Sequence, residues 1–234
     1  IPNFIDSASI VLVETSQTLQ ANQKNILKNF SPIWIETVSE IPEQPIFLIA
    51  NEFLDALPIR QFKKENNIWC ERFVSLSDNG NLQFTYINSN LNNELNFLYR
   101  DVPNDVVVEI SENTNDILSC LSEKIFRNSG VALLIDYGYF DGFGETLQAV
   151  SKHAYADPLT NLGANDLTSQ VNFKSIYKLI HRKKLRASNL ETQRNFLLGL
   201  GIEARAKILA KKLSKRKQML HFGAIDRLID TNEM

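Results

Sequence analysis

Short runs of apolar residues, separated by helical patterns, are the main feature of the sequence. They lie at residues 10–13, 33–35, 46–50 and 131–135. Continuous apolar runs of this length are typical of strands buried on both faces of a parallel sheet. Strands alternating with helices predict an α/β fold.

Four segments have the apolar spacing of amphipathic helices. Ser16 can cap the first, which carries Leu19, Ile26, Leu27 and Phe30 on one face. The spacing predicts three further helices, at residues 114–127, at 173–180 and, with a basic face, at 203–218. Residues 185–202, between the last two, are predicted to form a strand pair or a loop.

Residues 59–100 have a different pattern. Two β-rich runs, 68–76 and 82–86, flank Asn79-Gly80, which is a strong signal for a hairpin turn. An Asn-rich segment at 88–96 is predicted to be a loop, and residues 106–110 a short strand or the lead-in to the next helix. The sequence therefore predicts a single domain over residues 1–234, with an antiparallel ribbon inserted at 59–100.

Composition excludes several functional classes. The net charge of −2 argues against a strongly basic protein that wraps nucleic acid. The sequence has no apolar run long enough for a membrane span. Two cysteines are too few for a disulfide scaffold, and the three histidines lack metal-ligand spacing, so we expect no metal. Many asparagines, lysines and isoleucines favour an AT-rich bacterial source and a cytoplasmic location.

Acidic residues follow three of the predicted strands. They are Glu14, the pair Glu52 and Asp55, and Asp136. Because the carboxyl ends of parallel strands share one edge of a sheet, these carboxylates are expected to gather there. Such acids can hold the hydroxyls of a nucleotide ribose, or they can cap helices.

Two of these segments favour recognition of a cation. If the chain is helical after Ala50, Glu52 and Asp55 are neighbours on one face and can clamp a guanidinium, although they could equally complement the helix dipole. The run 136–139 offers an acid and two tyrosines that could form a cation–π wall or pack on the sheet. The basic cluster of the last helix is interpreted as a solvated face, with an acidic protein or nucleic acid as the alternative.

Six stretches in this order resemble the MidA-like family of S-adenosylmethionine-dependent methyltransferases. They are residues 12–16, 51–58, 135–138, 144–149, 166–168 and 198–202. Mitochondrial members of that family act as protein arginine methyltransferases in respiratory complex I assembly. The resemblance implies a class I methyltransferase (Rossmann-like) sheet with helices on both faces, and S-adenosyl-L-methionine as the cofactor.

The resemblance also implies roles for particular residues. The implied catalytic residues are Asn51, Glu52, Asp55 and Tyr137. The implied cofactor-binding residues are Glu14, Asn51 and Asp136, and the implied substrate-binding residues are Gly138, Gln148, His153 and Asp166. The implied partner is an acceptor protein such as a complex I subunit, with a homodimer as a further expectation and no nucleic acid. The implied location is the mitochondrial matrix if the source is eukaryotic.

The chain departs from the family at several places. Glu145, Gln170, Asn172 and Arg194 replace residues that are common there. The family's first strand and its Gly-x-Gly turn, which approaches the cofactor, have no counterpart, so we expect a truncated chain whose second and fourth family strands lack a partner between them. Each buried backbone group left unpaired costs about 1–3 kcal/mol. The alternative is therefore a non-catalytic assembly protein that keeps the partner-binding surface.

Overall fold

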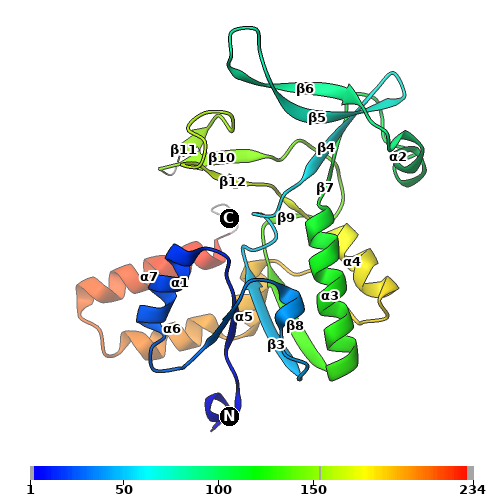
Figure 1. The fold of residues 1–234 in the computed structure, drawn as a ribbon. Coiled ribbons are helices and arrows are strands. Elements are labelled where there is room, and N and C mark those ends of the chain that lie inside the picture. The colour runs from blue at the N-terminus through cyan, green and yellow to red at the C-terminus, as the bar shows by residue number, and fades with distance from the viewer. Residues whose placement is uncertain (1–2, 153, 231–234) are drawn as a thin grey trace.

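The computed structural model describes residues 3–152 and 154–230 (Figure 1). A lower α/β part holds the parallel strands and most helices, and an antiparallel sheet lies above it in the view of Figure 1. In the lower part, β1 (Val11–Val13) pairs in parallel with β2 (Ile33–Ile35), and β3 (Ile46–Asn51) pairs in parallel with β8 (Gly130–Ile135). These four strands confirm the four apolar runs predicted from the sequence.

Helix α3 (Glu112–Asn128) covers one face of the β3–β8 pair, and α4 (Phe173–Arg182) packs against α3. Ser111 caps α3 by accepting a hydrogen bond from the amide of Thr114. The strand β8 begins with a glycine because a Cβ at Gly130 would lie 2.3 Å from the carbonyl oxygen of Ile46. The buried core of this part consists of Leu54, Leu118, Leu121, Val171, Ile176 and Leu179.

A groove of about 360 Å³ lies between β1 and β3. All three residues of β1 and all six of β3 line it, and the described residues place no strand between these two edges. Phe47 and Ile49 of β3 are 71% and 75% exposed. The two parallel pairs are therefore separate, as expected for a sheet of this class without its first strand.

The upper sheet has the strand order β6-β5-β4-β7 and is antiparallel throughout. Its strands are β4 (Arg60–Glu65), β5 (Ile68–Leu76), β6 (Leu82–Asn88) and β7 (Val107–Ile110). The hairpin of β5 and β6 was predicted, and Gly80 takes a positive φ of 76° in its turn. Strand β7 extends this sheet past the predicted ribbon of residues 59–100, because Val108 packs into the same core as Phe62 and Trp69.

The prediction of a loop at 88–96 is wrong, because α2 (Asn92–Leu98) occupies most of it. Asparagine disfavours helices, but tertiary contacts hold this one. Leu95 is 1% exposed, and Oδ1 of Asn92 accepts a 2.7 Å hydrogen bond from the amide of Trp69.

Five very short strands follow β8. The pair β9 (Gly138–Tyr139) and β13 (Val171–Asn172) is parallel, whereas β10 (Gln148–Ser151) lies between β11 (Ala154–Ala156) and β12 (Asp166–Thr168) in an antiparallel sheet. Strands of two to four residues are too short to show alternation, so the sequence did not predict them.

The remaining helices correct three expectations. Ser16 caps α1 (Gln17–Ile26) as predicted, but the helix ends before Phe30. The segment 185–202 contains α5 (Gln193–Gly199), capped by Thr192, and not a strand pair. The predicted helix at 203–218 is two helices, α6 (Ile202–Ala210) and α7 (Lys215–Ile229). The short turns η1 (Ile5–Ser7) and η2 (Val38–Glu40) complete the described chain, in which none of the helices is both long and apolar enough to cross a membrane.

Candidate functional site

The candidate site begins where β3 and β8 end. Asn51 pairs with Ile135, and the amide of Glu52 donates a 2.8 Å hydrogen bond to the carbonyl of Ile135. Glu52 then takes a φ of 47°, a left-handed conformation that is costly for a residue with a side chain and is common at functional sites. The chain is not helical after Ala50, so the condition under which Glu52 and Asp55 would be neighbours on a helix face is not met.

Asp136 determines this local fold. Its Oδ2 accepts hydrogen bonds from the amides of Leu54 (2.9 Å) and Asp55 (3.3 Å), and its Oδ1 accepts one from the amide of Tyr137 (3.0 Å). The pKa of Asp136 is raised, first by burial and then by the nearby charge of Asp55. The carboxylate at the end of β8 thus holds the loop after β3, and its role toward the cofactor stays a prediction.

Asp55 lies at the centre of the site and is 5% exposed. The hydroxyl of Tyr137 donates a 2.7 Å hydrogen bond to Oδ2 of Asp55, whereas Oδ1 has no hydrogen-bond partner among the described residues. Burial raises the pKa of Tyr137 to about 12, so its hydroxyl stays protonated and remains a donor at neutral pH. A buried carboxylate oxygen without a donor is unfavourable, and a cationic donor is the group that best satisfies it.

Gln148 and Thr168 extend the site to the small antiparallel sheet. They are paired across β10 and β12, and the side-chain amide of Gln148 donates a 3.2 Å hydrogen bond to Oγ1 of Thr168. Both side chains also hydrogen-bond the Tyr137 hydroxyl, which partly offsets the rise in its pKa. Thr168, which is buried, was not predicted as a site residue, although it ends one of the stretches that carry the family resemblance.

Two other predicted site residues, Glu14 and Asp166, do not join this cluster. Both carboxylate oxygens of Glu14 accept hydrogen bonds within its own segment, from the amide of Ser16 (2.8 Å) and the side chain of Gln23 (3.2 Å). Asp166 is exposed at the start of β12, and His153 lies outside the described residues. Each of these three roles stays a prediction.

The close pairing of β9 and β13 explains why residue 138 is a glycine. A Cβ at this position would lie 2.1 Å from the carbonyl oxygen of Val171, so only glycine allows β9 and β13 to pair this closely. The predicted substrate-binding role of Gly138 is therefore not needed to explain this glycine.

Glu109 of β7 links the upper sheet to the site and was not predicted. Its buried carboxylate accepts 2.8 Å hydrogen bonds from the side chain of Gln61 and the amide of Thr146, and a further one from the Thr146 hydroxyl. Arg72 of β5 forms an ion pair with Glu145. These contacts anchor the segment that leads into Gln148, and the pairing with Arg72 gives the unusual Glu145 a structural role.

The residues at the ends of β1 and β3 can accommodate a nucleoside. A carboxylate offers about four acceptor positions, so Glu14 keeps two for the hydroxyls of a ribose after bonding Ser16 and Gln23. The apolar groove between β1 and β3 opens beside it. For metals, no group of three or more histidine, cysteine or acidic side chains comes together within residues 3–152 and 154–230.

Comparison with known sequences gives one family model and several curated relatives. The family model, described as "Putative S-adenosyl-L-methionine-dependent methyltransferase", matches residues 1–190. The protein arginine methyltransferase NDUFAF7 homolog, mitochondrial, of Caenorhabditis elegans is 34% identical over 190 residues, which are 79% of this chain and 44% of the relative. The human protein arginine methyltransferase NDUFAF7, mitochondrial, is 30% identical over 217 residues, which are 90% of this chain and 48% of the relative. The chain spans about half the length of the curated relatives it matches.

Solved structures establish the fold. An uncharacterized Burkholderia thailandensis protein matches with a TM-score of 0.81 at 25% identity, over 97% of this chain and 63% of that protein. A second structure from that organism, bound to S-adenosyl-homocysteine, matches with a TM-score of 0.78 at 23% identity, over 97% of this chain and 61% of that protein. The expected class, an α/β fold of the class I methyltransferase type, is therefore confirmed.

Proposed function

Because the chain belongs to this family of S-adenosyl-L-methionine-dependent methyltransferases, we propose that the protein transfers a methyl group to an arginine side chain of a partner protein. The curated relatives named above are called protein arginine methyltransferases. The observation that carries the proposal is Asp55, a buried carboxylate with one oxygen held by Tyr137 and the other without a partner in the described chain.

In this proposal the cofactor, S-adenosyl-L-methionine, supplies an activated methyl group on a sulfonium. Glu14 holds the ribose, using the two acceptor positions left free by Ser16 and Gln23. Asn51 ends β3 at the same edge, between the groove and the loop that carries Asp55. The second solved structure described above, which is bound to S-adenosyl-homocysteine, supports the choice of cofactor through its fold, although it shares only 23% identity with this chain.

Two carboxylates are assigned to the arginine substrate. Oδ1 of Asp55 accepts a hydrogen bond from the guanidinium, and Glu52, whose exposed side chain has no partner among the described residues, binds the other side of the group. Asp136 and Tyr137 keep Asp55 in place through the bonds described above. Fixing the acceptor in line with the reacting carbon can supply about 7–11 kcal/mol of the barrier.

With the cofactor bound, its sulfonium would supply the methyl group, and Asp55 and Glu52 would hold the guanidinium nitrogen that accepts it. The nitrogen then loses one proton. Glu52 lies at the solvent-exposed side of the site and gives that proton a path to water. Because methyl transfer needs alignment more than acid–base strength, two carboxylates that position the substrate suit it.

The acceptor is proposed to be a protein such as a respiratory complex I subunit, and the active form a homodimer. The location is proposed to be the bacterial cytoplasm, or the mitochondrial matrix if the source is eukaryotic. The relatives in C. elegans and humans are named mitochondrial.

A non-catalytic assembly protein is the second candidate. It is favoured by the open groove between β1 and β3, where the edges of both strands lack a partner in the described chain. Calorimetry with S-adenosyl-L-methionine separates the two candidates. Binding by this chain, or by the full-length gene product, supports the enzyme. Absence of binding by both forms supports the assembly protein.

A further inference from the structure

The turn between α6 and α7 carries a dense group of positive charges. We call it the basic tip and define it by six exposed residues: Lys207, Lys211, Lys212, Lys215, Arg216 and Lys217. The sequence has no acidic residue between Glu203 and Asp226. None of the six forms an ion pair with another described residue, so the charge of the tip is not neutralised.

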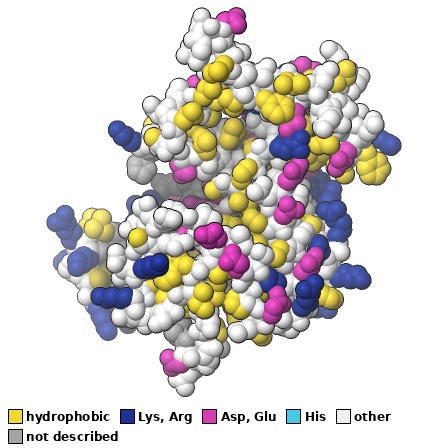
Figure 2. Space-filling model, viewed as in Figure 1, with side chains coloured by type: hydrophobic (Ala, Val, Ile, Leu, Met, Phe, Trp, Pro, Cys, Tyr) yellow, Lys and Arg dark blue, Asp and Glu magenta, His cyan; other side chains and the backbone are white. Residues whose placement is uncertain are grey.

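The basic tip extends away from the sheets. In Figure 1 the turn between α6 and α7 lies at the far left of the molecule, away from β3 and β8. Figure 2 shows dark blue side chains gathered at this edge around a yellow patch, with no magenta among them. Such a surface is free to approach a large flat partner.

Large apolar side chains lie beside these charges. Met219 is 77% exposed and Leu220 is 69% exposed on α7, and Ile208 is 59% exposed on α6. The side of the hairpin that packs uses smaller groups, since Ala206 and Ala210 are buried. The side chain of Gln218 donates hydrogen bonds to the carbonyls of Ala210 (3.0 Å) and Leu213 (3.1 Å). The two helices are therefore fixed to one another with their apolar residues facing outward.

The combination of charges and apolar groups indicates the kind of partner. A solvated helix face does not account for the exposed side chains of Met219 and Leu220. Nucleic acid does not account for them either, because proteins bind it mainly through charge and hydrogen bonds. A bilayer with anionic headgroups can bind both the charged and the apolar side chains, since lysines bind the phosphates while apolar side chains enter the boundary of the acyl chains. We propose that the basic tip docks the protein on the surface of an anionic membrane, independently of methyl transfer.

The proposal is tested by sedimentation of this chain with vesicles. One set contains phosphatidylcholine with about one third phosphatidylserine, and the other contains phosphatidylcholine alone. We expect binding to the anionic vesicles that disappears in high salt, and little binding to the neutral ones. Absence of binding to anionic vesicles, or equal binding to both sets, would overturn the proposal.

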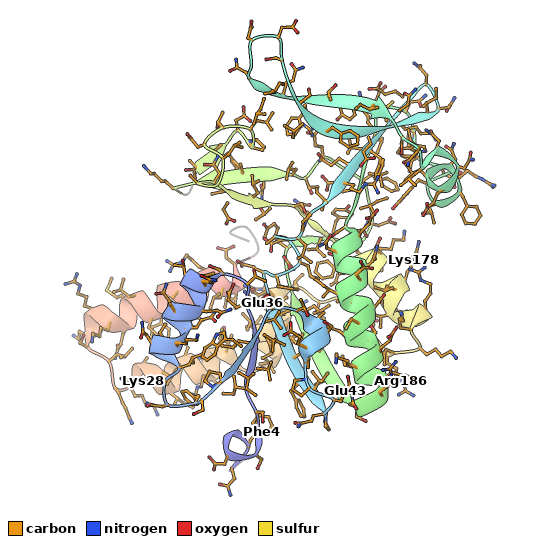
Figure 3. All side chains as sticks on the ribbon, in the orientation of Figure 1. Phe4, Lys28, Glu36, Glu43, Lys178 and Arg186 are labelled. Atoms are coloured by element: carbon orange, nitrogen blue, oxygen red, sulfur yellow. The ribbon has the colours of Figure 1, made fainter. Side chains whose placement is uncertain are left out.

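Matched variants identify the surface. K215E/K217E reverses two charges of the basic tip, and K178E/R186E reverses two exposed charges beside α4, on the other side of the molecule (Figure 3). We expect the first pair to weaken vesicle binding by about 30-fold or more and the second to leave it nearly unchanged. M219S/L220S should also weaken it, because these apolar groups no longer enter the bilayer.

Two results would count against the basic tip. Equal losses of vesicle binding in K215E/K217E and K178E/R186E would mean that the net charge of the protein, and not the basic tip, determines its attraction to the vesicles. Binding of an RNA oligonucleotide by the chain, with none to anionic vesicles, would assign the tip to nucleic acid. Circular dichroism of each variant checks that the helices remain folded.

Discussion

The hydroxyl of Tyr137, one residue past Asp136 at the end of β8, donates a 2.7 Å hydrogen bond to Oδ2 of Asp55 in the loop after β3. This bond joins residues 82 positions apart in the chain. It fixes one oxygen of a buried carboxylate and leaves the other available to a ligand.

Removing that donor should cost stability. In Tyr137→Phe, Oδ2 of Asp55 loses its partner while remaining buried, so we expect the free energy of unfolding in urea to fall by about 1–3 kcal/mol. Tyr155→Phe is the matched control, because Tyr155 is 83% exposed and its hydroxyl has no hydrogen-bond partner among the described residues. Equal unfolding midpoints for the two variants would show that the bond to Asp55 does not stabilise the fold.

The two carboxylates assigned to the substrate should both matter for catalysis. We expect Asp55→Asn and Glu52→Gln each to lower methyl transfer by about 100-fold, since each loses a charge-assisted bond that aligns the acceptor. Glu94→Gln is the control, because Glu94 is an exposed acidic residue of α2 without a partner in the part of the chain that the structure describes. Full activity in Asp55→Asn and Glu52→Gln would remove both residues from the proposed site.

Glycine at position 138 should be essential for folding. A Cβ there would lie 2.1 Å from the carbonyl of Val171, so Gly138→Ala must push β9 and β13 apart. We expect a loss of about 3 kcal/mol or more in urea unfolding. In Gly144→Ala the nearest atom lies 3.8 Å away, at Thr146, and this control should be well tolerated. A stable Gly138→Ala variant would contradict the close pairing of these strands.

Stability should depend on pH through Glu43. Hydrogen bonds from Lys124 and Asn128 lower the pKa of Glu43 in the folded chain. Because the folded pKa is below the unfolded one, the stabilisation is present above the ordinary pKa of about 4.3 and is lost as the pH falls through the folded value. We therefore expect wild type, from pH 6 to pH 3, to lose more of its urea midpoint than Glu43→Gln does. Parallel curves for the two proteins would rule out this contribution.

The parallel strands were predictable because each is a continuous apolar run whose pattern depends on burial alone. The local signals for caps and turns were also sufficient, as Ser16 and Gly80 show. Helices α2 and α5 were missed because Asn92 and Thr192 stabilise them through contacts or caps that outweigh weak propensities.

Some residues of the cluster around Asp55 were predicted from the sequence, but its geometry was not. The order of motifs identified Asp55 and Tyr137, whereas the bond between them depends on how β3 and β8 align. The turn at Glu52 is set by Asp136, which lies more than 80 positions away in the sequence and captures the amides of Leu54 and Asp55. The buried role of Glu109 could not be predicted from the sequence, because a single glutamate in a short strand is ordinarily solvated.

Transfer of a labelled methyl group is the most direct test of the proposed function. The full-length gene product is incubated with S-adenosyl-L-methionine labelled on its methyl group and with protein extract from cells that lack the gene. Mass spectrometry then locates the label. We predict labelled arginine with wild type and with Glu94→Gln, and a loss of about 100-fold with Asp55→Asn. Absence of labelled arginine with a wild-type protein that binds the cofactor, or undiminished labelling with Asp55→Asn, would contradict this account.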